Sequence, residues 1–442
     1  MTYFFRLENS KIESNGLEYF ENIDGDKQIE FYTINIPKND LLVILQNFKN
    51  NHLDAFLNNY TTVSFLIIIL DKKSNKLIVV NDKFGTNEIL IKIERGSINI
   101  SDSIHYLVDS KNILDNIDYD SAYEALSFYS IMPPKTIFKN IHSVALSHYE
   151  IIDIESKRTE AILYWDLDAL LNNKNKNYDN LVKQFRDIFT ERTRFLAGDG
   201  TAIALSGGID SGGILGIVNQ AVHKDNILSI TIGGHGEKTV DLTSSRDTID
   251  RLGVRNIEVY PILEDIKKLV NFYKDLSCPI LADTVLPYSI LAEVAGKHGF
   301  NKLLFGFGAE MHLGNLKVCK IAYRLSVIEK LIPKILMNVL YNLIVNMRGY
   351  SENQKMFLLA SSWSERFLFA RGPHYIHDKK FYRKISENFF QELVERFKIY
   401  LYYPPATKAS LTLSSRLRAW GFLALSATKA ETRRSRSFSP AW

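Results

Sequence analysis

Residues 204–213 read ALSGGIDSGG, and this short stretch decides the fold. The apolar run 202–205 leads into it and predicts a strand, and apolar residues at helical spacing follow it. Its glycines let backbone N–H groups approach an anion without obstruction by a Cβ, and a helix N-terminus adds partial positive charge. Ser206 and Ser211 can donate hydroxyl hydrogen bonds. The stretch therefore predicts an anion cradle between a strand and a helix.

Asp210 lies in the same stretch, and an acidic residue in an anion cradle needs its own explanation. A carboxylate does not favour a phosphate, but it suits the Mg²⁺ that accompanies ATP. The Walker A pattern G-x-x-x-x-G-K-S/T does not occur in the chain, so this is a different phosphate loop. The alternative interpretation is a glycine-rich turn that binds no ligand.

The strand–turn–helix pattern repeats after the cradle. Further strands are predicted at 227–232, 257–260 and 302–305, and helices at 214–222, 246–252 and 285–295. Alternating strands and helices are typical of an α/β fold with a doubly wound parallel sheet.

The first part of the chain is rich in strand signals instead. Two apolar runs, 62–70 and 76–81, flank a turn, and 147–152 with 158–163 form a second such pair. A helix is predicted at 120–129. The polar segment 172–177 is expected to be a linker, and the helical spacing of 181–196 follows it.

Composition sets limits on the class of protein. The chain has 442 residues, of which 46% are hydrophobic and 24% charged, so we expect two or three core-forming domains. Cys278 and Cys319 are its only cysteines, which excludes a disulfide framework and fits a reducing cytoplasm. The run 64–70 is too short to cross a membrane, and no signal peptide pattern is visible. We therefore expect a cytoplasmic protein without a membrane partner.

The last 39 residues differ from the rest. They lack Ile, Val, Asn, Asp and Tyr, and they carry seven basic residues against one acidic residue. Without them the chain has 47 basic and 49 acidic residues, so its body offers no electrostatic argument for nucleic-acid binding. Two interpretations remain open: a disordered basic tail, or a segment foreign to the domain that arose from a frameshift or fusion.

SGGIDS resembles the pyrophosphate loop of the N-type ATP pyrophosphatases. Within them the chain is most similar to the asparagine synthetase family, which includes β-lactam synthetases and lasso-peptide macrolactam cyclases. Four other segments share the resemblance in order and spacing over residues 60–315: VVNDKFG at 79–85, TIFKNI at 136–141, YWDL at 164–167, and LAD at 281–283 with Pro287-Tyr288.

The resemblance implies a domain plan. Residues 1–170 would form a β-rich, Ntn-hydrolase-like domain that resembles a degenerate class II glutamine amidotransferase. Residues 178–403 would form the ATP pyrophosphatase, or synthetase, domain with the doubly wound sheet. Residues 404–442 would be the atypical basic tail.

It also implies a chemistry and a set of site residues. A carboxylate would attack the α-phosphorus of ATP to give an acyl-adenylate, and an amine would then displace AMP. The pyrophosphate and Mg²⁺ would be held by the loop, and the adenosine by three residues near it. Carried over by motif, these are Ser206, Gly207, Gly208, Asp210 and Ser211 for the first role and Leu205, Ile232 and Gly306 for the second. Glu310 would be the second metal ligand, and Asp210 and Glu310 would be the catalytic pair.

The sequence departs from the family pattern in three places. Thr2 stands where the family has its nucleophilic cysteine, and the family's substrate loop N-G-E-I-Y-N is absent. Phe307 replaces an acidic residue or a tyrosine, and it can neither accept a proton nor donate a hydrogen bond. A late lysine expected to stabilise the adenylate has no match before the tail at 404–442.

The sequence therefore predicts an ATP-dependent, AMP-forming amide ligase without glutaminase activity. Its partners would be a carboxylate, such as aspartate, a small acid or a precursor peptide, and an amine. A peptide or small-molecule lactam cyclase is the favoured specialisation, and a homodimer is an open expectation. The alternatives are asparagine synthesis from aspartate, a truncated relative that binds nucleotide without turnover, and, less well supported, a tRNA-thiolating enzyme.

Overall fold

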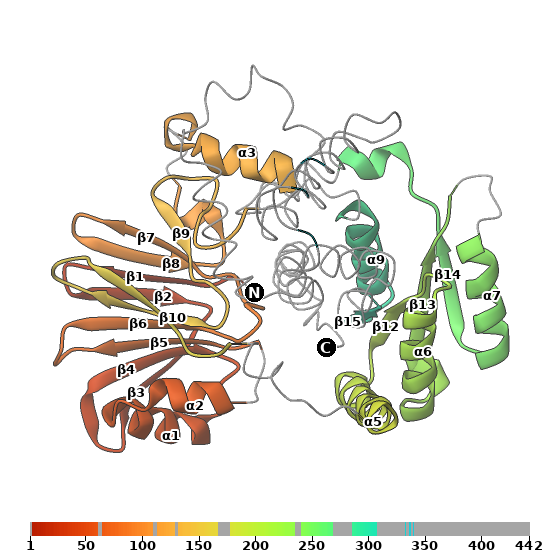
Figure 1. Ribbon diagram of the computed structural model, residues 1–442, viewed down its shortest axis with the longest axis horizontal. Helices are drawn as coiled ribbons and strands as arrows, with labels where there is room; N and C mark the ends of the chain where they lie inside the picture. Colours follow the sequence, from red (N-terminus) through yellow and green to blue (C-terminus); the bar gives the residue numbers. More distant parts are fainter. Residues whose placement is uncertain are drawn as a thin grey trace.

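The computed structural model describes residues 2–60, 64–108, 113–128, 131–166, 177–234, 240–267 and 285–306, with isolated positions at 332, 336 and 339. Figure 1 shows two antiparallel sheets in the N-terminal half and one parallel sheet with helices in the C-terminal half. The predicted fold class, a β-rich domain followed by a doubly wound α/β domain, is confirmed.

The N-terminal half is a sandwich of two antiparallel sheets. One sheet has the strand order β2-β1-β8-β7-β9, and the other has the order β11-β10-β6-β5-β4-β3. The first contains β1 (Phe4–Glu8), β2 (Lys11–Asn15), β7 (Leu90–Glu94), β8 (Ser97–Ser101) and β9 (Ile141–Ser143). The second contains β3 (Glu18–Ile23), β4 (Asp26–Ile34), β5 (Leu66–Asp71), β6 (Lys76–Asn81), β10 (His148–Asp153) and β11 (Thr159–Leu163).

Strand β5 is apolar at nearly every position because both of its faces are buried. Ile68 and the residues that alternate with it pack between the two sheets. Ile67 and Ile69 face the other way, against α1 (Lys38–Lys49) and α2 (Leu53–Asn59). Continuous apolar runs are expected for strands covered on both faces. The two predicted hairpins, β5–β6 and β10–β11, are confirmed with antiparallel register.

Two short 3-10 turns and one helix complete the described N-terminal half. They are η1 (Ile104–Tyr106), η3 (Leu114–Asn116) and α3 (Tyr119–Phe128), the last at the predicted position. Residues 172–176 of the predicted linker lie outside the described residues. Asn177 ends that segment as the N-cap of the next helix, where its side chain accepts the backbone N–H of Asn180 at 3.1 Å.

The C-terminal half is built on a four-stranded parallel sheet of order β14-β13-β12-β15. Its strands are β12 (Thr201–Ala204), β13 (Ile227–Ile232), β14 (Arg255–Val259) and β15 (Lys302–Phe305). The helices are α5 (Tyr178–Leu196), α6 (Ile209–Ala221), α7 (Val240–Leu252) and α9 (Val285–Lys297), and η4 (Lys224–Asn226) is a short turn.

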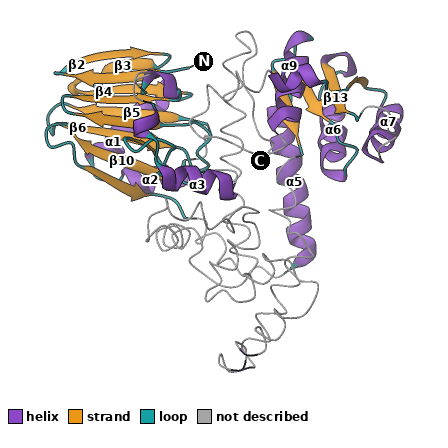
Figure 2. Cartoon of the chain, turned by 90° about the horizontal axis from the view of Figure 1, so that it is seen from above, coloured by secondary structure: helices purple, strands orange, loops and turns teal. Residues whose placement is uncertain are grey.

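Helices cover both faces of this sheet (Figure 2). On one face, Ile203 and Leu304 pack against α6 residues such as Leu215, with Phe189 of α5 and Ile249 of α7 at the margin. On the other, strand residues including Ala204 and Ile230 pack against Leu291 and Ala295 of α9. Buried apolar side chains on both faces explain why these strands read as short continuous apolar runs.

The strand order places a topological switch beside β12. The chain leaves β12 through α6 to β13 on one side, and β15 is added later on the other side. In open α/β sheets, ligands bind at the carboxyl ends of the strands where the order reverses. The ALSGGIDSGG stretch begins at this point. Within residues 2–306, no described helix has the length and hydropathy to cross a membrane.

Candidate nucleotide site

The loop between β12 and α6 is braced by its two serines. The Ser206 and Ser211 hydroxyl oxygens lie 3.1 Å apart, and the Ser206 backbone N–H donates to the Ser211 hydroxyl at 3.2 Å. Ser211 also donates to the Gly208 carbonyl at 3.2 Å. These bonds close the loop over the first turn of α6 and fix where its backbone N–H groups point.

Gly208 is the N-cap of α6, and no side chain caps the helix start. The first backbone N–H that donates within the turn is that of Gly212, to the Gly208 carbonyl at 3.0 Å. The preceding N–H groups of a helix have no intrahelical acceptor and carry the positive end of its dipole. Gly208 and Ile209 are exposed here, Ile209 by 89%. The loop therefore presents donors to solvent, as an anion site requires.

Gly207 has a left-handed backbone conformation, with φ of +73°, and packs tightly on α7. A Cβ at this position would lie 2.4 Å from the Asp241 carbonyl oxygen and 3.0 Å from Ser244 Cβ. Both the conformation and the space exclude any larger residue. The first turn of α7 is thus the back wall of the loop.

Gly306 packs against the loop from the β15 side of β12. A Cβ there would lie 2.8 Å from the Ser211 backbone nitrogen and 2.9 Å from Asp210 Cβ. Gly306 directly follows β15, so the carboxyl end of that strand abuts the start of α6. The structure therefore brings together six of the residues that the sequence analysis named: Ser206, Gly207, Gly208, Asp210, Ser211 and Gly306.

Asp210 is the carboxylate of the first turn of α6. Among the described residues no group of three or more His, Cys, Asp or Glu side chains could hold a metal ion. One carboxylate from the protein fits Mg²⁺, which is commonly held by one or two carboxylates together with substrate phosphates and water. Glu310, the predicted second ligand, lies outside the described residues, as does Phe307.

The two apolar residues predicted for the adenosine pocket lie on adjacent strands. Leu205 is 2% exposed, and its side chain packs into the core under α6. Its backbone N–H donates to the Ile230 carbonyl at 2.9 Å. Ile232 ends β13 and is partly buried on the α9 face. Their role in binding adenosine stays a prediction.

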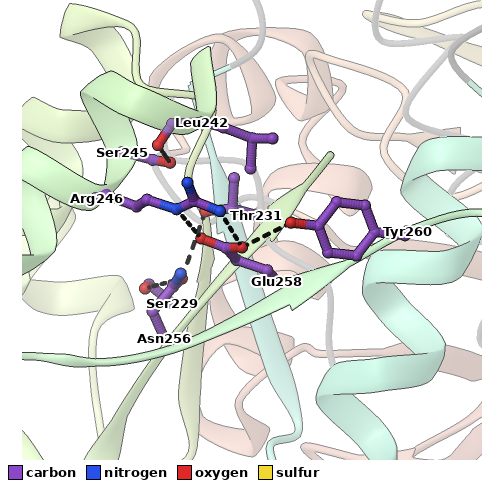
Figure 3. A network of polar contacts seen from close by, with 8 residues as sticks. All are labelled: Ser229, Thr231, Leu242, Ser245, Arg246, Asn256, Glu258 and Tyr260. Atoms are coloured by element: carbon purple, nitrogen blue, oxygen red, sulfur yellow. Dashed lines mark hydrogen bonds and ion pairs between the residues drawn. The ribbon is translucent and has the colours of Figure 1, made fainter. Parts of the chain in front are cut away.

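A polar network on β13, β14 and α7 was not anticipated from the sequence (Figure 3). Arg246 donates two hydrogen bonds to the Glu258 carboxylate, from Nε to Oε1 at 2.6 Å and from Nη2 to Oε2 at 2.7 Å. The Tyr260 hydroxyl donates to the same carboxylate at 2.8 Å. The hydrogen bond from Arg246 lowers the pKa of Glu258 to about 2, and the bond to Glu258 raises the pKa of Tyr260.

The N-terminal sandwich uses a motif carboxylate, Asp82, inside a turn. Asp82 is 1% exposed and accepts the backbone N–H of Phe84 at 2.8 Å and of Thr86 at 3.1 Å, as well as the Thr86 hydroxyl. Burial raises the pKa of Asp82, against these hydrogen bonds. Its described contacts brace the turn after β6.

The start of the chain is tied to residues that flank β8 and β7 of the first sheet. The Tyr3 backbone N–H donates to Asp102 at 2.9 Å, and the Tyr3 hydroxyl donates to the Glu88 carbonyl at 2.7 Å. Burial, with the Asp102 charge nearby, raises the pKa of Glu88 to about 8. Thr2, which the resemblance would put at the nucleophile position, directly precedes this anchored tyrosine.

Two family models match the chain. The model described as a glutamine amidotransferase domain matches residues 36–165, and the model described as asparagine synthase matches residues 190–426. The first covers most of the antiparallel sandwich. The second contains the whole loop at the switch point and extends beyond the described residues.

Individual relatives are distant and longer than the matched region. A probable glutamine-hydrolyzing asparagine synthetase of Acanthamoeba polyphaga mimivirus is 23% identical over 51% of this chain and 40% of its own length. A putative glutamine-hydrolyzing asparagine synthetase of Methanocaldococcus jannaschii is 24% identical over 61% and 52%. The chain thus spans about half or less of these relatives. Among solved structures, an NH3-dependent NAD synthetase from Campylobacter jejuni aligns with a TM-score of 0.25, 12% identity, and coverage of 55% and 95%.

Proposed function

Because the chain belongs to the asparagine synthase family, whose model covers more than half of it, we propose that it is an ATP-dependent amide ligase. It would join a carboxylate to an amine and release AMP and pyrophosphate. The observation that carries the proposal is the loop of Ser206, Gly207 and Gly208 at the switch point, backed by the N-terminus of α6.

The geometry suits pyrophosphate as the group held by the loop. Backbone N–H groups at the helix start lie beside two serine hydroxyls, and the missing Cβ atoms of Gly207 and Gly306 let the loop pack closely on α7 and β15. Such donors stabilise negative charge that grows on a leaving pyrophosphate. Bound Mg²⁺ would neutralise phosphate charge beside Asp210, which explains a carboxylate in an anion site.

The amine is proposed to come from ammonia or from the substrate itself. A glutaminase of this architecture would need a nucleophile at the start of the sandwich. Residues 1–166 contain no cysteine that could serve as this nucleophile. An amine within the same substrate would give a lactam or macrolactam, so cyclisation of a peptide or small molecule is the favoured specialisation.

Asparagine formation from aspartate and ammonia is the second candidate. It is favoured by the relatives described as asparagine synthetases. Either reaction uses the same pyrophosphate loop, so the two differ only in the acyl and amine substrates.

The experiment incubates the full chain with ATP, Mg²⁺ and a panel of carboxylates, each with and without ammonium. Aspartate tests asparagine formation, and ω-amino acids and linear peptides test cyclisation. AMP and pyrophosphate are measured by chromatography, and amide products by mass spectrometry. We expect carboxylate-dependent AMP and pyrophosphate in equal amounts.

Asp210→Asn is the matched control, since it removes one charge with almost no change of shape. AMP formation that is equal in wild type and in this variant, or release of ADP and phosphate instead, would rule out the proposed reaction. Glutamine is included as a separate amine source. Efficient use of glutamine by the purified chain would contradict the proposed absence of glutaminase activity.

A further inference from the structure

Strands β13 and β14 carry a polar strip on the face that is turned away from α9. Residues such as Ile230 pack toward α9, so the residues that alternate with them face the side of α7. By register these are two cross-strand pairs, Ser229 with Asn256 and Thr231 with Glu258. Ser229 is 0% exposed and Thr231 is 1% exposed, so the strip is covered (Figure 3). A polar strip offers a covering helix little apolar area, so directional contacts must set where that helix lies.

Helix α7 has few apolar residues with which to cover this strip. Its residues 243–248 read TSSRDT, so the sequence has no apolar residue between Leu242 and Ile249. Leu242 is buried, and Ile249 is a partly buried residue that packs on the α6 side of the sheet. Arg246 lies in the gap between them and donates two hydrogen bonds to Glu258 of β14. The ion pair therefore ties the middle of α7 to the sheet.

The same part of α7 supports the anion loop. A Cβ on Gly207 would lie 2.4 Å from the Asp241 carbonyl oxygen. It would also lie 3.0 Å from Ser244 Cβ and 3.1 Å from the Ser245 backbone nitrogen. Arg246 directly follows these two serines in the helix. Because Gly207 packs on the backbone of α7, a displacement of the helix at Arg246 would also displace the wall on which the loop rests.

The ion pair fixes a direction as well as a distance. Two nitrogens of Arg246 bind different oxygens of Glu258, at 2.6 Å and 2.7 Å, and such two-point bonds are geometrically specific. The Tyr260 hydroxyl donates to the same carboxylate at 2.8 Å, which adds a third hydrogen bond to that group. Groups that are held in place before a ligand arrives lose less entropy when it binds.

We propose that Arg246 and Glu258 are positioning residues for pyrophosphate, because their ion pair fixes α7 on the polar strip and α7 in turn supports Gly207. The two side chains act through the helix and the loop, without contacting the ligand. This inference rests on the proposed function, which places the pyrophosphate of ATP in the loop. It separates the ion pair from ordinary packing of α7, since only the half of the helix next to the loop should affect anion binding.

The test measures the binding of inorganic pyrophosphate with Mg²⁺ by calorimetry on the full chain. Arg246→Met removes a positive charge, and Glu258→Gln removes a negative one. Both variants should weaken binding by about threefold to fivefold, a modest effect that suits an exposed ion pair. A direct effect of charge on the anion would instead weaken binding in the first variant and strengthen it in the second. Arg246→Lys keeps the charge without the two-point bond, so it should also weaken binding, though less.

Leu252→Ala is the matched control, because Leu252 packs at the far end of the same helix. It should lower the melting temperature and leave pyrophosphate affinity within about twofold of wild type. Opposite changes in Arg246→Met and Glu258→Gln, unchanged affinity in both, or an equal loss in Leu252→Ala would overturn the inference. If Arg246→Met does not fold, Arg246→Lys decides, and wild-type affinity in that variant would overturn the inference. Wild type that binds no pyrophosphate would instead overturn the proposed function itself.

Discussion

Gly306 and Ser211 lie so close that a Cβ on Gly306 would stand 2.8 Å from the Ser211 backbone nitrogen. This contact joins the carboxyl end of β15 to the first turn of α6. The two segments are almost 100 residues apart in sequence, and parallel pairing of β12 with β15 brings them together. The position of the anion loop therefore depends on the pairing of β15 with β12.

Gly306→Ala should displace the first turn of α6, because the added methyl collides with backbone rather than with a flexible side chain. Overpacking of this kind typically costs about 1–3 kcal/mol of stability. We expect ATP affinity to fall by at least about tenfold, since a 1.4 kcal/mol loss corresponds to that factor. Calorimetric titration measures it, with Gly213→Ala, which meets no atom within 4 Å, as the control. Unchanged affinity in Gly306→Ala would contradict the arrangement.

Gly207→Ala tests the back wall of the loop. The left-handed conformation alone costs an alanine about 1–2 kcal/mol, and the collision with the Asp241 carbonyl adds to it. We expect a lower melting temperature and the loss of pyrophosphate binding. Gly216→Ala, in the middle of α6 with open space around it, should instead stabilise the protein by about 0.5–1 kcal/mol. If both variants melted alike, the conformation of Gly207 would be of no consequence.

The loop and its sheet could be predicted from sequence because their signals are local. The apolar runs of β12, β13 and β15 and the helical spacing of α5 each lie within one short window. The Arg246–Glu258 pair could not be predicted, since it depends on how α7 docks on β14 across a turn. Strands β2 and β3 were also not specified, because both are mostly exposed and carry few apolar residues.

The candidate site residues divide in the same way, into a local motif that could be predicted and tertiary contacts that could not. Ser206 to Ser211 form one continuous motif, whereas the contact of Gly207 with α7 depends on tertiary packing that no motif encodes. Glu310, Phe307 and the tail 404–442 lie outside the described residues, so their predicted roles stay predictions. The domain boundaries at 170, 178 and 403 also stay predictions.

The ion pair between Arg246 and Glu258 should lower the free energy of unfolding as the solution becomes acidic. Hydrogen bonding to Arg246 lowers the pKa of Glu258 to about 2, below its ordinary value near 4.5. The contribution of the pair is therefore complete above about pH 4.5 and is lost as the pH falls toward 2. Because Arg246 is half exposed, screening by solvent keeps this contribution small. Melting temperatures of Glu258→Gln and wild type should converge between pH 4.5 and 2, and a constant difference would contradict the assignment.

Glu88 should instead lower the free energy of unfolding as the pH rises. Burial raises its pKa to about 8, so the folded chain holds a proton that the unfolded chain releases near pH 4.5. Stability from this group is present at low pH and declines as the pH rises from about 4.5 through 8. Glu88→Gln, which stays neutral, should lose less stability than wild type between pH 6 and 9. Thermal melts across that range measure it, and parallel profiles for the two proteins would refute the shift.

The ALSGGIDSGG loop is proposed to hold the pyrophosphate of ATP with Mg²⁺ at Asp210. The most direct measurement is calorimetric titration of ATP into the full chain, with Mg²⁺ and with a chelator, for wild type and Asp210→Asn. The account predicts that wild type binds ATP in Mg²⁺ at least about tenfold more tightly than either the variant in Mg²⁺ or wild type in chelator. Equal affinities under all three conditions, or no ATP binding by wild type, would contradict it.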